Sequence, residues 1–152
     1  ISIQLVDFKG LVRSIPANKI SFNYRSIELP KDLIFLSATF KGKQKNSEEI
    51  NNYMTELNTI KNMAQPTKIK TSGSTFKNPI SQTDKKVWEL IKSSVSNEIS
   101  YGDAVISKKH ANFFVNKKNA KAADMKSLIN FVKKKVKDQT GIKLELEIVV
   151  VE

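Results

Sequence analysis

Four side chains in this sequence have types suited to chemistry: Arg25, Ser74, His110 and Glu147. Arg25 follows Tyr24 in a short aromatic segment, where a fixed guanidinium could bind a carboxylate or stabilise an enolate-like charge. The alternative is a surface arginine that stacks on the tyrosine ring. Chain order leaves a Ser-His-Asp triad open for Ser74, but no Gly-x-Ser-x-Gly motif surrounds that serine.

Glu147 lies in a C-terminal run with alternating apolar residues and shares one face of it with Val149 and Val151. It could be an ordinary solvent-side residue of an edge strand. If another domain covers that face, desolvation would raise the pKa of the carboxyl and suit it to proton transfer. His110 is the only histidine. No His-Glu-x-x-His spacing surrounds it, so we expect it to form hydrogen bonds within the fold.

Ser74 belongs to the stretch 71–79, Thr-Ser-Gly-Ser-Thr-Phe-Lys-Asn-Pro, which lies between two segments with helical periodicity. Gly73 permits a close backbone approach, and Pro79 disfavours a helix at Asn78. We therefore expect a loop, and composition alone favours a plain turn. The sequence has neither a P-loop nor a Gly-x-Gly-x-x-Gly motif, so nucleotide phosphates would have to be held in another way.

The elements that position these side chains follow from hydrophobic periodicity and end signals. A helix capped by Asn46 carries an apolar stripe, which we expect to be core: Ile50, Tyr53, Met54, Leu57, Ile60 and Met63. A short helix is capped by Thr83 or Asp84, and a last helix runs from a cap at Asn119 to Gly141. The expected strands are residues 1–6, 11–15, 33–40 (a buried strand), 104–106, 113–116 and 143–151, the last being the clearest.

Composition limits the class of protein. The chain of 152 residues has no cysteine, which excludes disulfides and thiolate chemistry and allows a reducing compartment. No apolar run could span a bilayer, and no signal peptide opens the chain. The first residue is Ile1 within a strand-like pattern, which indicates a piece of a longer protein.

The net charge of +11 raises the possibility of a polyanion partner. Residues 1–65, 66–102 and 103–152 carry 9, 6 and 11 basic against 6, 3 and 6 acidic residues, so the excess is spread along the chain. A nucleic-acid groove would concentrate it on one face. A non-catalytic basic module that binds a polyanion or nucleic acid stays as the alternative function.

Four ordered segments resemble the C-terminal half of the UDP-N-acetylenolpyruvoylglucosamine reductase family. They are residues 22–26 (Phe-Asn-Tyr-Arg-Ser), 72–79, 105–116 (Val-Ile-Ser-Lys-Lys-His-Ala-Asn-Phe-Phe-Val-Asn) and 144–148 (Leu-Glu-Leu-Glu-Ile). The resemblance implies a bacterial, cytoplasmic flavoenzyme of peptidoglycan synthesis. Such an enzyme reduces UDP-N-acetylglucosamine enolpyruvate to UDP-N-acetylmuramate, with electrons passing from NADPH through FAD.

The resemblance also implies roles for single residues. Arg25 matches the arginine that polarises the substrate carboxylate, Ser74 the serine that protonates the substrate after hydride transfer, and Glu147 the glutamate that works beside the arginine. Substrate contacts are implied for Tyr24, Gly73, Lys77 and Asn78. No metal site is implied.

The resemblance further implies an α+β fold of antiparallel strands with packed helices. Residues 1–65 would form the incomplete C-terminal part of the FAD-binding domain, and 66–152 a substrate-binding domain with a returning terminal strand. Most of the FAD site would lie outside this chain, in a missing N-terminal flavin domain that acts as its partner. We therefore expect the chain alone to be inactive. A degenerate relative that keeps the fold without the chemistry is a further alternative.

Overall fold

A computed structural model describes residues 1–67 and 69–151 of the chain. The fold is α+β with antiparallel sheets, as predicted. It divides into two compact units, Ile1–Ile50 and Asn51–Glu152, each of which is described by itself. Among the described residues, no helix is long and apolar enough to cross a membrane.

The first unit is built on a three-stranded antiparallel sheet in the order β2-β1-β5. The strands predicted for residues 1–6 and 11–15 are confirmed, and they pair as an antiparallel hairpin. Gly10 takes a φ of +84° in the turn, and the Asp7 carboxylate accepts hydrogen bonds from the backbone N–H groups of Lys9 and Leu11 at 3.0 and 2.9 Å. The unit comprises β1 (Ser2–Asp7), β2 (Val12–Pro16), a 3-10 turn (Ala17–Lys19), β3 (Phe22–Asn23), β4 (Ser26–Ile27) and β5 (Leu33–Thr39).

β5 is a strand, as predicted, but it is not buried. Ile34, Phe35 and Leu36 are all at least half exposed. The strand lies at the edge of its sheet, and within residues 1–67 and 69–151 its one strand partner is β1. A continuous apolar run predicts a strand covered on both faces, and the described chain does not supply those two covering layers.

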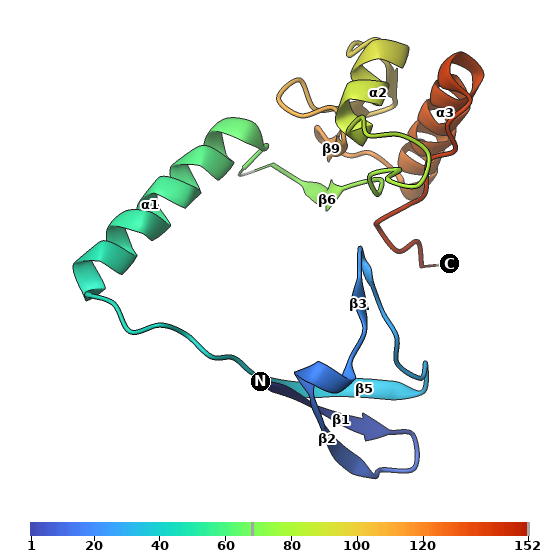
Figure 1. Ribbon diagram of the computed structural model, residues 1–152. Helices are drawn as coiled ribbons and strands as arrows, with labels where there is room; N and C mark the ends of the chain where they lie inside the picture. The colour runs from blue at the N-terminus through green and yellow to red at the C-terminus, as the bar shows by residue number, and fades with distance from the viewer. Residues whose placement is uncertain (68, 152) are drawn as a thin grey trace. The chain divides into compact units, whose positions relative to one another are not determined.

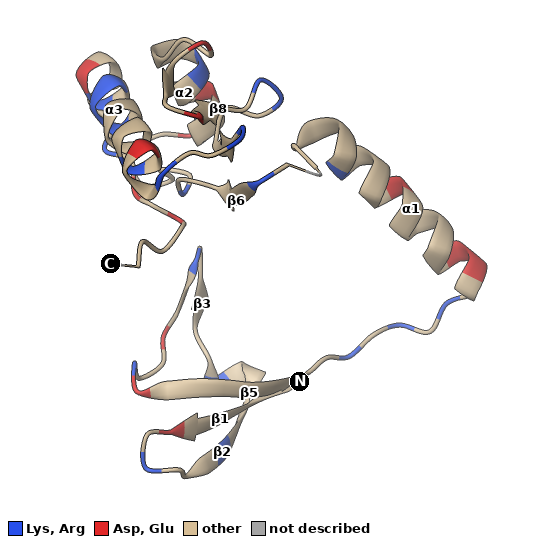
Figure 2. Cartoon of the chain, turned by 180° about the vertical axis from the view of Figure 1, so that it is seen from behind, with Lys and Arg blue, Asp and Glu red and all other residues tan. Residues whose placement is uncertain are grey.

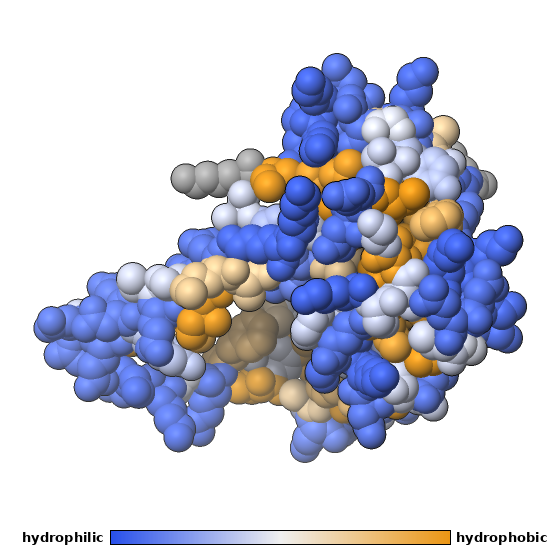
Figure 3. Space-filling model, turned by 90° about the horizontal axis from the view of Figure 1, so that it is seen from above, coloured by the Kyte–Doolittle hydropathy of each residue, from blue (hydrophilic) through white to orange (hydrophobic). Residues whose placement is uncertain are grey.

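Helix α1 (Ser47–Ala64) begins where predicted, because the Asn46 side chain accepts a hydrogen bond from the Glu48 N–H at 2.8 Å. Its apolar stripe was expected to be core, and this expectation is wrong, since α1 has no buried residue. Helical spacing determines which side chains share a face, but burial requires a second element packed on that face. Apolar side chains are correspondingly visible at the surface among hydrophilic ones (Figure 3).

The second unit contains a four-stranded antiparallel sheet with α2 and α3 packed beside one another (Figure 1). Strands β8 and β9 have the predicted bounds. The core lies between the sheet and the two helices and includes Phe76, Ile91, Ile106, Phe114, Leu128 and Val132. The sheet order is β6 (Thr71–Ser74), β9 (Phe113–Asn116), β8 (Ala104–Ile106), β7 (Ser100–Tyr101), and the helices are α2 (Val87–Ser94) and α3 (Ala122–Thr140).

Both helices of this unit begin later than predicted. The N-cap of α2 is Lys86 rather than Thr83 or Asp84, and the N-cap of α3 is Lys121 rather than Asn119. In each helix an acidic side chain at the third position accepts the N–H of the capping lysine, at 2.7 Å in α2 and 2.8 Å in α3. Carboxylates in the first turn are also favoured by the helix dipole. Gly141 ends α3 with a φ of +75°, as predicted.

The strand predicted for residues 143–151 is wrong. This segment forms a single antiparallel bridge, between Leu146 and Phe76. Leu144 is buried, and Leu146 and Ile148 pack partly against the core. The apolar face predicted from the alternation is therefore correct as far as Ile148. Val149 is 86% exposed. An alternating pattern becomes a strand only where a backbone partner continues alongside it.

Candidate functional site

Ser74 ends the edge strand β6 just after a bulge. The pairing of β6 with β9 slips between Thr71 and Ser74, so Ser72 and Gly73 bulge outward. Gly73 has a φ of +87°, which a glycine adopts without strain, and no described atom lies within 4 Å of where its Cβ would be. The expected loop is therefore in part a bulged strand, and the plain turn that composition favoured is wrong for residues 71–74.

The backbone after Ser74 is held on one side by Asn112. The Thr75 N–H donates to the Asn112 carbonyl at 2.8 Å. The Asn112 side-chain amide accepts from the Phe76 N–H at 3.0 Å and donates to the Phe76 carbonyl at 2.9 Å. Thr75, Phe76 and Asn112 are all buried. The backbone beside Ser74 is therefore fixed within the core.

On its other side the same segment meets the C-terminal residues. The Glu147 N–H donates to the Thr75 carbonyl, and the Lys77 N–H donates to the Glu145 carbonyl, both at 2.9 Å. Lys77 Nζ lies 3.8 Å from Glu145 Oε2, where the Lys77 side chain is partly buried and the Glu145 side chain is largely exposed. Glu147 is half-buried. The structure therefore brings Glu147 next to Thr75, the residue that follows Ser74, across 72 positions of sequence.

Asn78 links this segment to helix α2. Its side-chain oxygen accepts a hydrogen bond at 3.0 Å from the N–H of Val87, the first residue of the helix. The first N–H groups of a helix have no partner within the helix, so this contact fixes where α2 begins. Asn78 consequently has a structural role in addition to any contact with a ligand.

Arg25 lies in the first unit, at the tip of the β3–β4 hairpin. Its φ of 56° makes it the only described non-glycine residue in the left-handed region. Its guanidinium lies 5.2 Å from the centre of the Tyr24 ring, and both residues are exposed. The predicted stacking on the ring is present. The left-handed backbone costs energy for an arginine, and such strain is often found at functional sites.

His110 lies in the turn between β8 and β9 and forms hydrogen bonds within the fold, as predicted. Its Nδ1 accepts the Asn112 N–H at 3.2 Å, and its carbonyl accepts the Phe113 N–H at 2.9 Å. Its ring packs edge-on against Phe113 at 4.8 Å between centres. Burial lowers the pKa of His110 from its usual 6.5, an effect that a hydrogen bond with its own backbone partly opposes. The neutral imidazole that accepts from Asn112 is therefore favoured.

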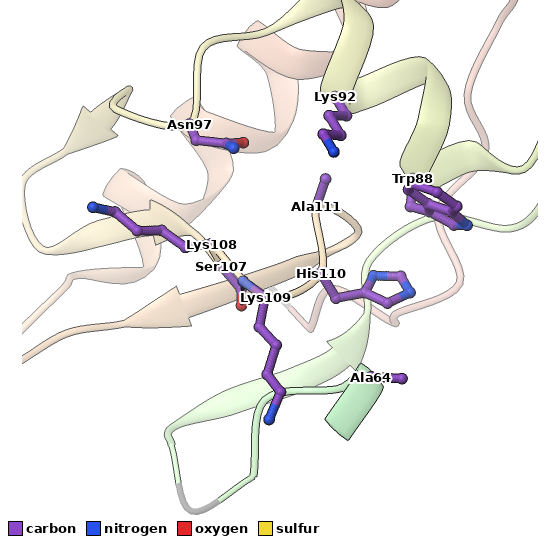
Figure 4. A pocket seen from close by; sticks show the side chains of 9 residues that line it. All are labelled: Ala64, Trp88, Lys92, Asn97, Ser107, Lys108, Lys109, His110 and Ala111. Atoms are coloured by element: carbon purple, nitrogen blue, oxygen red, sulfur yellow. Dashed lines mark hydrogen bonds between the residues drawn. The ribbon is translucent and has the colours of Figure 1, made fainter. Parts of the chain in front are cut away.

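A pocket of about 340 Å³ opens beside His110 (Figure 4). Its wall combines two rings with cationic side chains: Trp88, Lys92, Lys108, Lys109 and His110. Lys109 is anchored by a hydrogen bond to the backbone carbonyl of Asn62 in α1. Sequence reasoning did not identify this pocket. The signal for it was the run Lys108-Lys109-His110 directly after a predicted strand, since such loops often carry binding residues.

Among the described residues, the charged side chains and the residue types that bind metals do not point to a further site. Basic and acidic side chains both occur in each of the two units (Figure 2). Among residues 1–67 and 69–151, no group of three or more His, Cys, Asp or Glu side chains is arranged to hold a metal ion.

The chain is similar to known proteins over almost its whole length. It is 64% identical to the UDP-N-acetylenolpyruvoylglucosamine reductase of Pelagibacter ubique (strain HTCC1062) and 43% identical to that of Rickettsia bellii (strain RML369-C). Each match covers 97% of this chain but only 49% and 48% of the relative, so the chain spans about half the length of these relatives.

A solved structure is also similar. It is the UDP-N-acetylenolpyruvylglucosamine reductase of Thermus caldophilus, which matches with a TM-score of 0.77 and 30% identity over 96% of this chain and 50% of that one. The family model for the C-terminal domain of UDP-N-acetylenolpyruvoylglucosamine reductase matches residues 65–151. The chain therefore belongs to the UDP-N-acetylenolpyruvoylglucosamine reductase family and carries its C-terminal domain.

Proposed function

We propose that this chain forms the C-terminal half of a bacterial, cytoplasmic flavoenzyme of peptidoglycan synthesis. The enzyme reduces UDP-N-acetylglucosamine enolpyruvate to UDP-N-acetylmuramate and draws its electrons from NADPH through FAD. Family membership supports the reaction. The observation that carries the assignment of the site is the backbone pairing of Thr75 with Glu147, which brings a hydroxyl and a carboxyl into one local structure.

The chemistry explains why these residue types are needed. Hydride addition to the β-carbon of an unsaturated acid leaves negative charge on the carboxylate and the α-carbon. A cation, the Arg25 guanidinium, and an acid, the Glu147 carboxyl, stabilise that charge. The Ser74 hydroxyl gives its proton to the α-carbon and completes the addition. Because serine is a weak acid, this role depends on accurate placement and on the basicity of the carbanion that it meets.

The substrate is held by residues near these groups. Tyr24 contacts it from the hairpin that carries Arg25. Gly73, whose bulge presents open space, lets the backbone approach the ligand closely. Lys77 and Asn78 contact the sugar nucleotide, Lys77 through its ammonium group and Asn78 through its amide.

The first unit, as far as the structure describes it, does not by itself fit FAD. The cavity in this unit that Leu5, Asp7 and Arg13 help to line holds about 200 Å³, below the roughly 300–1,000 Å³ of typical ligand pockets. In the complete enzyme, a bound flavin would supply the hydride. We propose that its site lies largely in a partner N-terminal domain, with residues 1–65 completing that domain and residues 66–152 binding substrate.

The role of the chain as half of an enzyme is tested on the purified chain itself. We expect no yellow flavin absorbance after purification. We also expect no NADPH oxidation with the enolpyruvyl substrate, measured at 340 nm. Joining the chain to the remaining half of the Pelagibacter ubique relative should restore both. Turnover by the isolated chain would contradict the division of the flavin site.

The acid role of Ser74 is tested in that joined enzyme. We expect Ser74→Ala to leave flavin reduction by NADPH unchanged and to slow flavin reoxidation by substrate by about 100-fold or more, measured by anaerobic stopped-flow absorbance. Ser72→Ala is the matched control, because it removes an exposed hydroxyl two residues away. Unchanged reoxidation in Ser74→Ala would remove Ser74 from the reaction.

A further inference from the structure

We propose that Asn112 is a positioning residue for Ser74. Its side-chain amide fixes the backbone two residues beyond the serine and so keeps the hydroxyl where the substrate needs its proton. The inference rests on the proposed function of Ser74. Asn112 does not touch the reacting atoms in this scheme. It acts through the segment that it holds.

The amide of Asn112 takes the place of a strand partner for Phe76. A neighbouring strand would satisfy both the N–H and the carbonyl of one residue, and Asn112 does this with a single side chain, at 3.0 and 2.9 Å. Asn112 is 3% exposed and Phe76 is 1% exposed. Water therefore does not reach these hydrogen bonds to replace them. Removing the amide would leave the N–H and the carbonyl of Phe76 buried without a hydrogen-bond partner.

The neighbours of Phe76, Thr75 and Lys77, are held by backbone hydrogen bonds, but none of these bonds uses the N–H or the carbonyl of Phe76 itself. Its ring packs edge-to-face on Phe114, with 5.8 Å between centres, which fixes the side chain but not the backbone orientation. On the other side of Ser74 lies Gly73 in the bulge of an edge strand, with space around it. A shift of the backbone at Phe76 would therefore also move Ser74, because the bulge at residues 72 and 73 allows the backbone before Ser74 to adjust.

Asn112 is itself held in place by the turn that carries it. Its N–H donates to Nδ1 of His110, and its carbonyl accepts from Thr75. The turn therefore fixes both the backbone and the direction of the Asn112 side chain. The result is a continuous set of contacts from His110 through Asn112 to the residue that follows Ser74.

Asn116 offers a close match for comparison. It lies on β9, four residues after Asn112, and its side-chain amide also spans one backbone unit. Its oxygen accepts the Ala120 N–H at 2.9 Å and its nitrogen lies 3.5 Å from the Ala120 carbonyl. The segment that it holds leads into α3 and does not carry Ser74. The two asparagines therefore separate a general structural role from the positioning of the serine.

The test uses the joined enzyme described above, with flavin bound. We expect Asn112→Leu to slow substrate-dependent flavin reoxidation by about 100-fold, the effect of roughly 1 Å of misplacement. Flavin reduction by NADPH and the substrate concentration at half-maximal rate should stay as in the unmodified enzyme. Asn116→Leu should leave both half-reactions unchanged.

Two further variants and a measurement without turnover complete the test. In a Ser74→Ala background, Asn112→Leu should add no further loss, because the group that it positions is already absent. Amide hydrogen exchange of the peptide that contains Phe76 should accelerate in Asn112→Leu but not in Asn116→Leu. If Asn112→Leu does not fold, Asn112→Asp, which keeps the acceptor and loses the donor, replaces it with the same expectations.

The proposal is overturned if Asn112→Leu and Asn116→Leu slow reoxidation equally, or if the loss from Asn112→Leu persists in full in the Ser74→Ala background. A different outcome distinguishes the positioning role of Asn112 from the proposed acid role of Ser74. If Ser74→Ala alone leaves reoxidation unchanged, the acid role of Ser74 fails. Faster exchange at Phe76 in Asn112→Leu would then still show that Asn112 holds this backbone.

Discussion

Each unit contains a strand rich in large apolar residues, but these residues are buried in one unit and exposed in the other. β9 in the second unit and β5 in the first both carry runs of large apolar residues. Phe114 of β9 is 1% exposed, whereas Phe35 of β5 is 55% exposed. β9 lies inside its sheet, between β6 and β8, and its Phe114 side chain belongs to the core formed with α2 and α3. β5 is an edge strand, and most of its apolar residues are exposed among the described residues.

The difference teaches that composition of a strand does not determine its burial. A strand has two faces and two edges, and each must be occupied by another element before its apolar residues leave water. The second unit supplies those elements within its own sequence. It is also the unit in which the backbone of Glu147 pairs with Thr75, the residue that follows Ser74.

The largest expected effect comes from the core of the second unit. Phe114→Ala should lower the free energy of unfolding by about 3–5 kcal/mol, through lost apolar contact and the cavity that remains. Urea unfolding followed by fluorescence would measure it, because Trp88 in α2 is the only tryptophan. Val149→Ala, at an exposed site of the same unit, should change it by less than about 0.5 kcal/mol. Similar losses in both variants would mean that the described core does not dominate stability.

An intermediate effect is expected from pH. Because burial lowers the pKa of His110 below 6.5, the unfolded chain binds a proton more readily than the folded one. The stability that comes from neutral His110 is fully present above pH 6.5 and is lost as the pH falls through the lowered pKa. Thermal unfolding between pH 8 and pH 5, read from Trp88, would measure the loss. In His110→Gln this part of the pH dependence should disappear. If this variant loses as much stability between pH 8 and pH 5 as the unmodified chain does, the pH dependence belongs to other groups.

The smallest effect is expected in the first unit. Phe35→Ser should change the free energy of unfolding by less than about 0.5 kcal/mol, since the ring is more than half exposed. Thermal unfolding of the isolated chain followed by circular dichroism would measure it. A loss above about 1 kcal/mol would show that β5 is covered in solution, and it would erase the contrast between the units.

Much of the local structure could be predicted from sequence because it depends on near neighbours. Alternating apolar residues predicted β1, and a side-chain cap predicted the start of α1. Gly141 predicted the end of α3. The other two helix starts were wrong, since an acidic residue in the first turn, rather than the hydroxyl or amide before it, meets the first N–H. Competing local partners of this kind have nearly equal energies, so spacing alone does not rank them.

The sequence suggested residue types for the candidate site but not the contacts that hold those residues in place. The ordered segments identified the family, and the comparisons confirm that assignment. The roles of Arg25, Ser74 and Glu147 stay predictions. Nothing in the sequence indicated that the backbone of Phe76 is held by Asn112, because this contact joins residues that are distant along the chain. The run Lys108-Lys109-His110 marked a loop but did not show that Trp88 would complete a pocket with it.

The sequence by itself therefore determined the α+β class, most of the helices and strands, and membership of the reductase family. These depend on short-range periodicity and on segments that keep their order along the chain. The tertiary structure decided which apolar faces are buried, why residues 143–151 form one bridge rather than a strand, and how Glu147 comes to pair with the residue that follows Ser74. Each of these depends on a partner supplied from elsewhere in the chain, and the free energy of burial or pairing exists only when that partner is in place.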